Sequence, residues 1–132
     1  MLDVKDLNIE FHDHLVPETV VHQVSFHMEA GEIVGLVGES GSGKSMTALA
    51  IAGLLSRHDM KKTGEILFEG TDLLHCERSF LRELQGNDIS VVFQEPMTSL
   101  NPVYRIGWQV EEPLRIHHPA VSYTHLRAHE TL

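Results

Sequence analysis

The run Gly38-Glu39-Ser40-Gly41-Ser42-Gly43-Lys44-Ser45 has the spacing G-x-x-x-x-G-K-[ST] of a phosphate-binding loop, the Walker A motif. Glycines let the backbone curl around a phosphate and point amide N–H groups at it, where a Cβ would block the approach. Lys44 offers a cation to the β- and γ-phosphates, and Ser45 offers an oxygen ligand of the kind that Mg²⁺ prefers. The motif predicts a nucleoside triphosphate with Mg²⁺, bound by Gly38, Glu39, Ser40, Gly41, Ser42, Gly43, Lys44, Ser45 and Met46.

The segments on either side of this loop fit the motif. Residues 33–37 form a continuous apolar run, which predicts a strand buried on both faces of a parallel sheet. Residues 44–55 are rich in Ala and Leu and predict a helix, whose N-terminus adds partial positive charge beside the phosphates. The alternative, a flexible Gly/Ser turn, would not require a strand and a helix there. Strand, glycine loop and helix in this order indicate an α/β fold.

The other elements follow from apolar periodicity. Alternating residues predict two strands that pair antiparallel, with a slip near Asp6 that indicates a bulge. Pro113 is expected to kink or restart the last predicted helix. The predicted strands are 2–11, 19–28, 64–69 and 89–93, the last of the buried type, and the further helices are 72–84 and 106–117.

Composition limits the possible classes of protein. The chain has 132 residues, 42% of them hydrophobic and 22% charged, which is typical of a globular protein with one core. Its net charge of -9 argues against a nucleic-acid partner, because phosphate neutralisation requires clustered Lys and Arg. The single cysteine, Cys76, cannot form an internal disulfide, and no apolar run approaches the roughly 20 residues that span a bilayer. We therefore expect a soluble protein of the cytoplasm.

Three longer segments carry a family resemblance. VSFHMEAGEIVGLVGESGSGKS is similar to the start of an ATP-binding cassette (ABC) nucleotide-binding domain. VVFQEPMTSLNPV resembles the Q-loop segment in the ATPase subunits of oligopeptide, dipeptide and nickel importers, and GEILFEGTDLL fits the hairpin of the family's β-subdomain. The resemblance covers about residues 2 to 118. It implies a truncated P-loop NTPase fold, with an antiparallel β-subdomain and the first part of a RecA-like parallel-sheet core.

The resemblance also implies roles for single residues. Gln94 would be the Q-loop glutamine, which acts with Lys44 in catalysis and reaches Mg²⁺ together with Ser45. Phe11 would stack on adenine, although an aromatic at the end of a strand can equally belong to the core. Glu95 follows an apolar strand and could be taken for the catalytic acid of a Walker B motif. This interpretation is disfavoured, because Gln94 stands where that motif has Asp.

The function that the resemblance implies is that of an ATP-binding subunit of an ABC importer, which couples ATP binding and hydrolysis to uptake of di- or oligopeptides, or nickel. The loop after Gln94 would contact the transmembrane subunits of a permease at the cytoplasmic face of the membrane, where the protein would be peripheral. A second ABC ATPase subunit, identical or different, would complete the ATP site, and a solute-binding protein would act indirectly.

Other interpretations stay open at this point. The Walker A motif alone also fits a P-loop kinase, a GTPase or a stand-alone nucleotide-binding module. A fragment that misfolds, because its apolar strands keep open edges, is a further alternative. A zinc site among the ten histidines is disfavoured, because residues such as His12 and His14 have no acidic or Cys partner at ligand spacing.

The end of the chain departs from the family pattern. AVSYTHLRAHETL has no periodicity, and residues 120–131 resemble a translated transposase-library sequencing adapter at every position. We expect residues 1–119 to be the N-terminal part of an ABC nucleotide-binding domain and residues 120–132 to be a non-native tail. After Gln94 we recognise no LSGGQ-type signature, no Walker B strand ending in Asp-Glu and no switch histidine. The chain is therefore expected to be catalytically incompetent.

Overall fold

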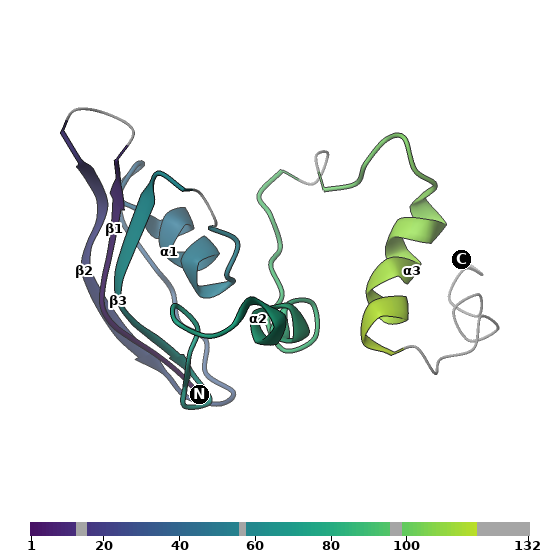
Figure 1. The fold of residues 1–132 in the computed structure, drawn as a ribbon, viewed down its shortest axis with the longest axis horizontal. Helices are drawn as coiled ribbons and strands as arrows, with labels where there is room; N and C mark the ends of the chain where they lie inside the picture. Colours follow the sequence, from purple (N-terminus) through teal and green to yellow (C-terminus); the bar gives the residue numbers. More distant parts are fainter. Residues whose placement is uncertain (13–15, 56–57, 96–98, 119–132) are drawn as a thin grey trace. The chain divides into compact units, whose positions relative to one another are not determined.

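The computed structural model describes residues 1–12, 16–55, 58–95 and 99–118 (Figure 1). It is an α/β protein that divides into two compact units, Met1–Arg82 and Glu83–Leu132. The elements in chain order are β1 (Leu2–Phe11), β2 (Glu18–Met28), α1 (Lys44–Ile51), β3 (Met60–Phe68), β4 (Thr71–Asp72), α2 (Arg78–Leu84) and α3 (Ile106–His117).

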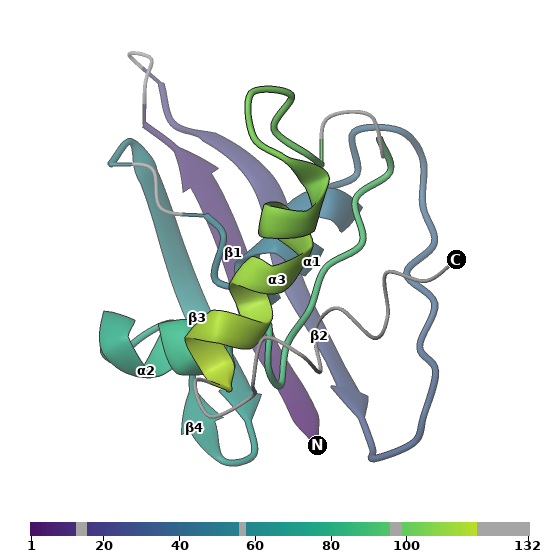
Figure 2. The same ribbon diagram turned by 90° about the vertical axis from the view of Figure 1, so that its right-hand side faces the viewer.

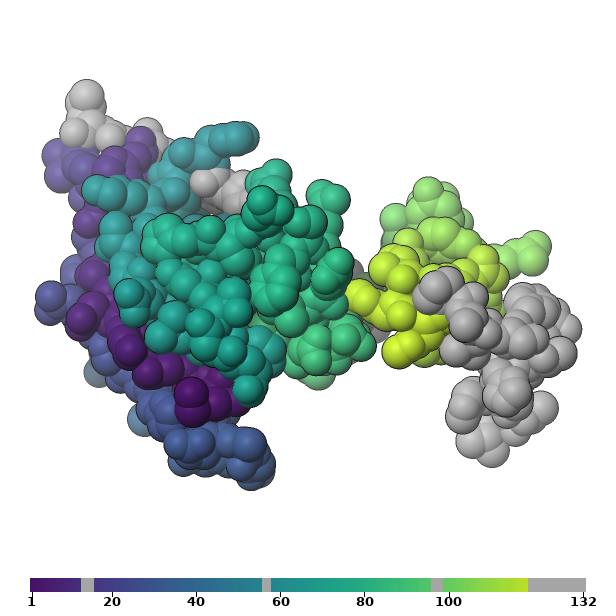
Figure 3. Space-filling view, turned by 60° about the horizontal axis from the view of Figure 1, so that its bottom comes forward, coloured from purple at the N-terminus to yellow at the C-terminus, as the bar shows by residue number. Residues whose placement is uncertain are grey.

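The first unit is built on an antiparallel sheet with strand order β2-β1-β3-β4. The apolar residues of β1 alternate as predicted, and its central position lets Val4 pair with Phe26 on β2 and Ile66 on β3. Helix α1 packs on one face of the sheet, against β2 (Figure 2). Figure 3 shows part of this order at the surface, where the purple N-terminal strand lies beside the teal segment. The core consists mainly of Leu2, Val4, Leu7, Ile9, Val21, Ala50, Ala52, Leu55, Ile66 and Leu73.

The predicted bulge in the first strand is confirmed. The backbone of Asp6 is left-handed, with φ of +46°, and the pairing register shifts between Val4 and Leu7. On β3, Gly64 lies so close that a Cβ there would be 2.5 Å from the Asp6 carbonyl oxygen, so this position requires glycine. Across the other edge of β1, the hydroxyl of Ser25 accepts a hydrogen bond from the Asp6 N–H at 2.8 Å. The irregular backbone of β1 is therefore matched on both neighbouring strands.

The two predicted buried strands are not formed in the described part of the chain. Residues 33–37 and 89–93 lie outside the described strands, and the pairing found in them is a single isolated bridge between Ile89 and Gln85. Ile33 is 97% exposed and Val92 is 98% exposed. A strand of this type needs partner strands on its edges, and the described sheet includes neither run. The predicted parallel part of the sheet is therefore absent from the described residues.

Three predicted boundaries were also wrong. Helix α1 ends at Ile51 rather than residue 55, because Gly53 adopts a left-handed φ of +68° that ends the helical path. Strand β3 begins at Met60, since its first residues find partners on β1. The predicted helix 72–84 is shortened to α2, because Asp72 pairs in β4 instead.

The second unit contains helix α3, which has the predicted bounds and runs through Pro113 without a break in the helix. The side-chain amide of Gln109 donates to the carbonyl oxygens of Asn101 at 2.9 Å and Tyr104 at 3.0 Å, so it holds the preceding loop against the helix. The rings of Tyr104 and Trp108 lie 5.3 Å apart. None of the described helices is long and apolar enough to cross a membrane.

Asp72 organises the turn between β4 and α2. Its Oδ1 accepts the N–H groups of Leu74 at 3.0 Å and Ile66 at 3.2 Å, and its Oδ2 lies 2.5 Å from Nδ1 of His75. Burial acts to raise the pKa of Asp72, but the hydrogen bonds from His75, Leu74 and Ile66 outweigh it, and the pKa is lowered. A carboxyl whose pKa is lower in the folded state stabilises the fold above its unfolded pKa. That contribution is lost as the pH falls through the folded pKa.

We therefore expect Asp72→Ala to lower the free energy of unfolding by about 1–3 kcal/mol at pH 7, because two backbone donors lose their acceptor. Asp72→Asn keeps an acceptor oxygen but not the charge, so its deficit relative to the wild type should shrink as the pH falls below about 4. Urea titrations at pH 7 and in the acid range measure both effects. A deficit of Asp72→Asn that does not change with pH would contradict the assignment.

Candidate nucleotide site

The glycine loop connects residues 33–37 to helix α1. The N–H of Ser42 donates to the carbonyl oxygen of Glu39 at 3.2 Å and closes a turn. Helix α1 begins at Lys44, immediately after Gly43. The carbonyl oxygen of Gly43 accepts both the N–H of Thr47 at 2.8 Å and its hydroxyl at 3.0 Å. The end of the loop is thereby joined to the first turn of the helix, whose N-terminal N–H groups are available to an anion.

Gly43 lets the loop pack closely against β2. Its φ is +83°, and a Cβ at this position would lie 2.5 Å from the Val20 carbonyl oxygen and 2.9 Å from a methyl carbon of Val21. Gly41 has a similar φ of +80°, but a Cβ there would meet nothing within 4 Å. Gly43 is therefore required for both conformation and space, whereas Gly41 is required for conformation alone.

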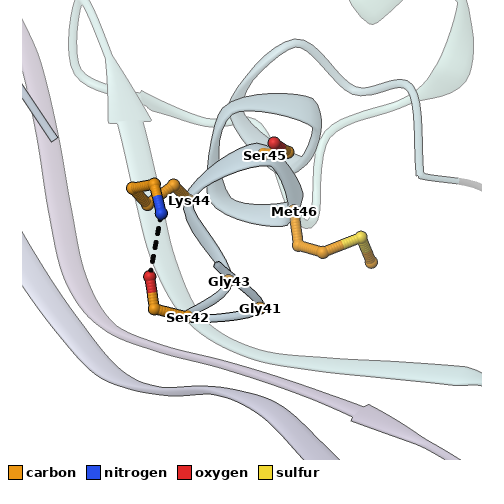
Figure 4. A pocket seen from close by; sticks show the side chains of 6 residues that line it. All are labelled: Gly41, Ser42, Gly43, Lys44, Ser45 and Met46. Atoms are coloured by element: carbon orange, nitrogen blue, oxygen red, sulfur yellow. Dashed lines mark hydrogen bonds between the residues drawn. The ribbon is translucent and has the colours of Figure 1, made fainter. Parts of the chain in front are cut away.

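Lys44 lies folded over the loop. Its ammonium donates to the carbonyl oxygens of Glu39 at 2.7 Å and Gly38 at 2.8 Å, and to the hydroxyl of Ser42 at 3.2 Å. Figure 4 shows the side chains of Lys44 and Ser42 pointing toward each other, with Met46 directed away from them. A hollow of about 160 Å³ is lined by Gly41, Ser42, Gly43, Lys44, Ser45 and Met46.

A second hollow, of about 180 Å³, adjoins the loop. Lys44 and Ser42 line it as well, so the lysine side chain borders both hollows. Thr47 also lines it, although its side chain was not predicted as a site residue. This threonine is only 3% exposed, and a hydroxyl within an Ala- and Leu-rich helix is the signal that could have identified it. The remaining lining residues are Val24, Leu36, Val37 and Gly38.

The residues of the loop fit a magnesium ion that is held mainly by phosphates. Ser45 is exposed in the first turn of α1 and presents a hydroxyl oxygen. Mg²⁺ in nucleotide sites takes one or two protein oxygens, with phosphate and water as the other ligands. In the described ranges no group of three or more His, Cys, Asp or Glu residues could hold a metal ion.

The other two predicted site residues, Phe11 and Gln94, belong to other segments of the chain. Phe11 ends β1, where it pairs with Glu18 and Met60 and is half-buried. Gln94 belongs to the second unit, where it is exposed in a bend after residues 89–93. The structure therefore brings together residues 38–46, and the roles of Phe11 and Gln94 remain predictions. Part of the predicted permease loop, residues 96–98, lies outside the described residues.

Curated relatives share the sequence over most of the chain. The dipeptide transport ATP-binding protein DppD of Haemophilus influenzae is 45% identical over 117 residues, and that of Escherichia coli is 40% identical over the same length. Both matches cover 89% of this chain and 36% of the relative. The peptidoglycan transport ATP-binding protein YejF of Agrobacterium fabrum is 48% identical over 118 residues, which cover 22% of that relative. The chain thus spans about a third of the length of the DppD relatives.

Solved structures of an ABC cassette share the fold. The dimeric structure of MJ0796, a bacterial ABC transporter cassette, matches with a TM-score of 0.82 and 24% identity, over 97% of this chain and 53% of that one. A second MJ0796 structure, in a post-hydrolysis state bound to ADP and Pi, matches with a TM-score of 0.79 and 23% identity. The predicted P-loop NTPase fold of the ABC type is therefore confirmed, including its truncation relative to a whole cassette.

The family can now be assigned. The profile of the ABC transporter family matches residues 21–128, which include the glycine loop and the segment around Gln94. The match favours this family over the kinase and GTPase alternatives. Residues 119–132 lie outside the described part, so the non-native origin of residues 120–132 stays a prediction. A Walker A loop at the start of a helix, a cassette fold and a profile match over most of the chain agree, and the chain belongs to the ABC transporter family.

Proposed function

We propose that this chain is the nucleotide-binding part of an ATPase subunit of an ABC importer for di- or oligopeptides, or nickel. The observation that carries the proposal is the loop 38–45, which presents Lys44 and the N-terminus of α1 to a shared hollow. The printed functions of the relatives, dipeptide transport and peptidoglycan transport, favour a peptide-like solute. The structure of MJ0796 with ADP and Pi supports a nucleotide as the ligand of this fold.

Each part of the loop has a distinct role in this proposal. The backbone N–H groups of residues 41–45 and the N-terminus of α1 hold the phosphates. Lys44 offsets charge at the β- and γ-phosphates, and Ser45 with Gln94 holds Mg²⁺, which supplies further positive charge when bound. Phe11 stacks on adenine. With Lys44 placed to stabilise the transferring phosphoryl group, Gln94 reports its presence to the rest of the transporter.

The partners follow from the printed functions of the relatives. Transport ATP-binding proteins act with membrane-spanning subunits, and we assign the loop after Gln94 to that contact. The dimeric structure of MJ0796 supports pairing with a second ABC subunit, identical or different. A solute-binding protein would act through the permease. The subunit would be peripheral, on the cytoplasmic face of the membrane.

The 132-residue chain is expected to bind ATP without turning it over, because the signature, Walker B and switch motifs are not recognisable in it. Calorimetric titration with ATP and Mg²⁺ measures binding, and release of inorganic phosphate measures turnover. We expect saturable binding and no sustained phosphate release. Phosphate release that continues beyond one equivalent, and that disappears in Lys44→Ala, would contradict this expectation. Absence of binding by the folded chain would contradict the proposed site itself.

A further inference from the structure

The ammonium of Lys44 has all three of its N–H donors engaged by the loop. Two go to the carbonyl oxygens of Gly38 and Glu39, at 2.8 and 2.7 Å. The third goes to the hydroxyl of Ser42, at 3.2 Å. The two carbonyl acceptors belong to the backbone and would be present whatever the side chains at these positions. The Ser42 hydroxyl is therefore the one acceptor of the three that a side chain supplies.

Ser42 is itself held in place. Its N–H bonds to the Glu39 carbonyl oxygen at 3.2 Å, and its Oγ lies over Gly38, where a Cβ would approach it to 2.6 Å. The same residue 39 carbonyl therefore accepts from both Ser42 and Lys44. A hydroxyl fixed in this way restricts the lysine, whose four-carbon stem otherwise retains extensive rotamer freedom.

We propose that Ser42 is a positioning residue that acts through Lys44: its hydroxyl keeps the lysine side chain folded over the loop, so that on binding the ammonium turns an N–H donor from a loop carbonyl oxygen to a phosphate without reordering its stem. The binding readout of this inference rests on the proposed function. The competing possibility is that the Ser42 hydroxyl donates directly to a phosphate, so that its effect on binding does not depend on Lys44. The two possibilities differ in whether the effect of Ser42 depends on the presence of Lys44.

A double-mutant cycle separates them. Ser42→Ala is expected to weaken ATP binding about two- to fivefold, because the lysine must be ordered on binding. Ser42→Thr, which keeps the hydroxyl, should stay close to the wild type. In a Lys44→Ala background, Ser42→Ala should have no further effect on ATP binding, followed by NMR titration at millimolar ATP. An equal loss in both backgrounds, or a failure of Ser42→Thr to retain affinity, would overturn the proposal while leaving the nucleotide site intact.

A second measurement needs no nucleotide. Lysine acetylation by a water-soluble reagent, read by mass spectrometry of the peptides, reports how freely the Lys44 nitrogen is reached. Lys61, exposed on β3, is the internal reference. Ser42→Ala should raise the labelling rate of Lys44 relative to Lys61 about two- to fivefold, as the stem gains freedom, and Ser42→Thr should leave the ratio unchanged. An unchanged ratio in Ser42→Ala would overturn the proposal even if ATP binding failed in every variant.

Discussion

Lys44→Ala is expected to weaken ATP binding by about 1.5–3 kcal/mol, roughly a factor of 10 to 150, because a charged hydrogen bond to phosphate is lost. Lys44 borders both hollows of the loop, as Ser42 does, and it is the cation between them. Its contacts within the protein are to exposed carbonyl and hydroxyl groups, so their loss leaves no buried group without a partner. The fold should therefore persist, and calorimetric titration with ATP measures the loss of affinity.

The matched control is Lys61→Ala, which removes the same charge from an exposed position on β3. With a net charge of -9, a general electrostatic effect of losing one cation would act on both variants alike. We expect Lys61→Ala to bind ATP as the wild type does. Equal weakening in the two variants would assign the effect to overall charge and would remove Lys44 from the site.

Gly43→Ala is expected to lower the free energy of unfolding by about 2–4 kcal/mol. One part is conformational, since an L-residue in the left-handed region costs about 1–2 kcal/mol. The remaining part is steric, because the added methyl would lie 2.5 Å from the Val20 carbonyl oxygen and would push the loop away from β2. Urea-induced unfolding, followed by circular dichroism, measures the difference from the wild type.

Gly41→Ala is the matched control, since φ is +80° at Gly41 and +83° at Gly43 but open space surrounds only Gly41. It should lose only the conformational part, about 1–2 kcal/mol. Stability losses of the same size in both variants would mean that the contact of the loop with β2 contributes nothing. A folded Gly43→Ala variant that binds ATP with wild-type affinity would show that the contact of the loop with β2 is not needed for the nucleotide site.

Local patterns in the sequence predicted the local structure well. The bounds of β1, its bulge at Asp6 and the bounds of α3 follow from alternation and helical spacing, which depend on neighbouring residues only. The loop 38–45 was predicted from its own residues, although the close approach of Gly43 to Val20 on β2 could not be. Gly53 shows the limit, since the Ala- and Leu-rich pattern continues past the residue that ends α1.

Features that depend on distant partners were not predictable in this way. Residues 33–37 have the composition of a buried strand, but a strand forms only where another strand pairs with it, and the described residues supply none. The early start of β3 at Met60 depends on pairing with Phe11, far away in sequence. The hydrogen bonds from Lys44 to two backbone carbonyl oxygens could not be predicted either. A pattern of side-chain types carries no information on which backbone acceptors a lysine will reach. Composition indicates which secondary structure a segment can form, and the neighbouring segments determine whether it forms.

We propose that the backbone of residues 38–45 holds the phosphates of a nucleotide. Amide NMR of the ¹⁵N-labelled chain tests it most directly, by titration with ATP and Mg²⁺, with tripolyphosphate and Mg²⁺, and with adenosine. We predict that the amide resonances of residues 41–45 shift with ATP and with tripolyphosphate but not with adenosine. Shifts confined to other segments, or equal shifts with adenosine, would contradict the claim.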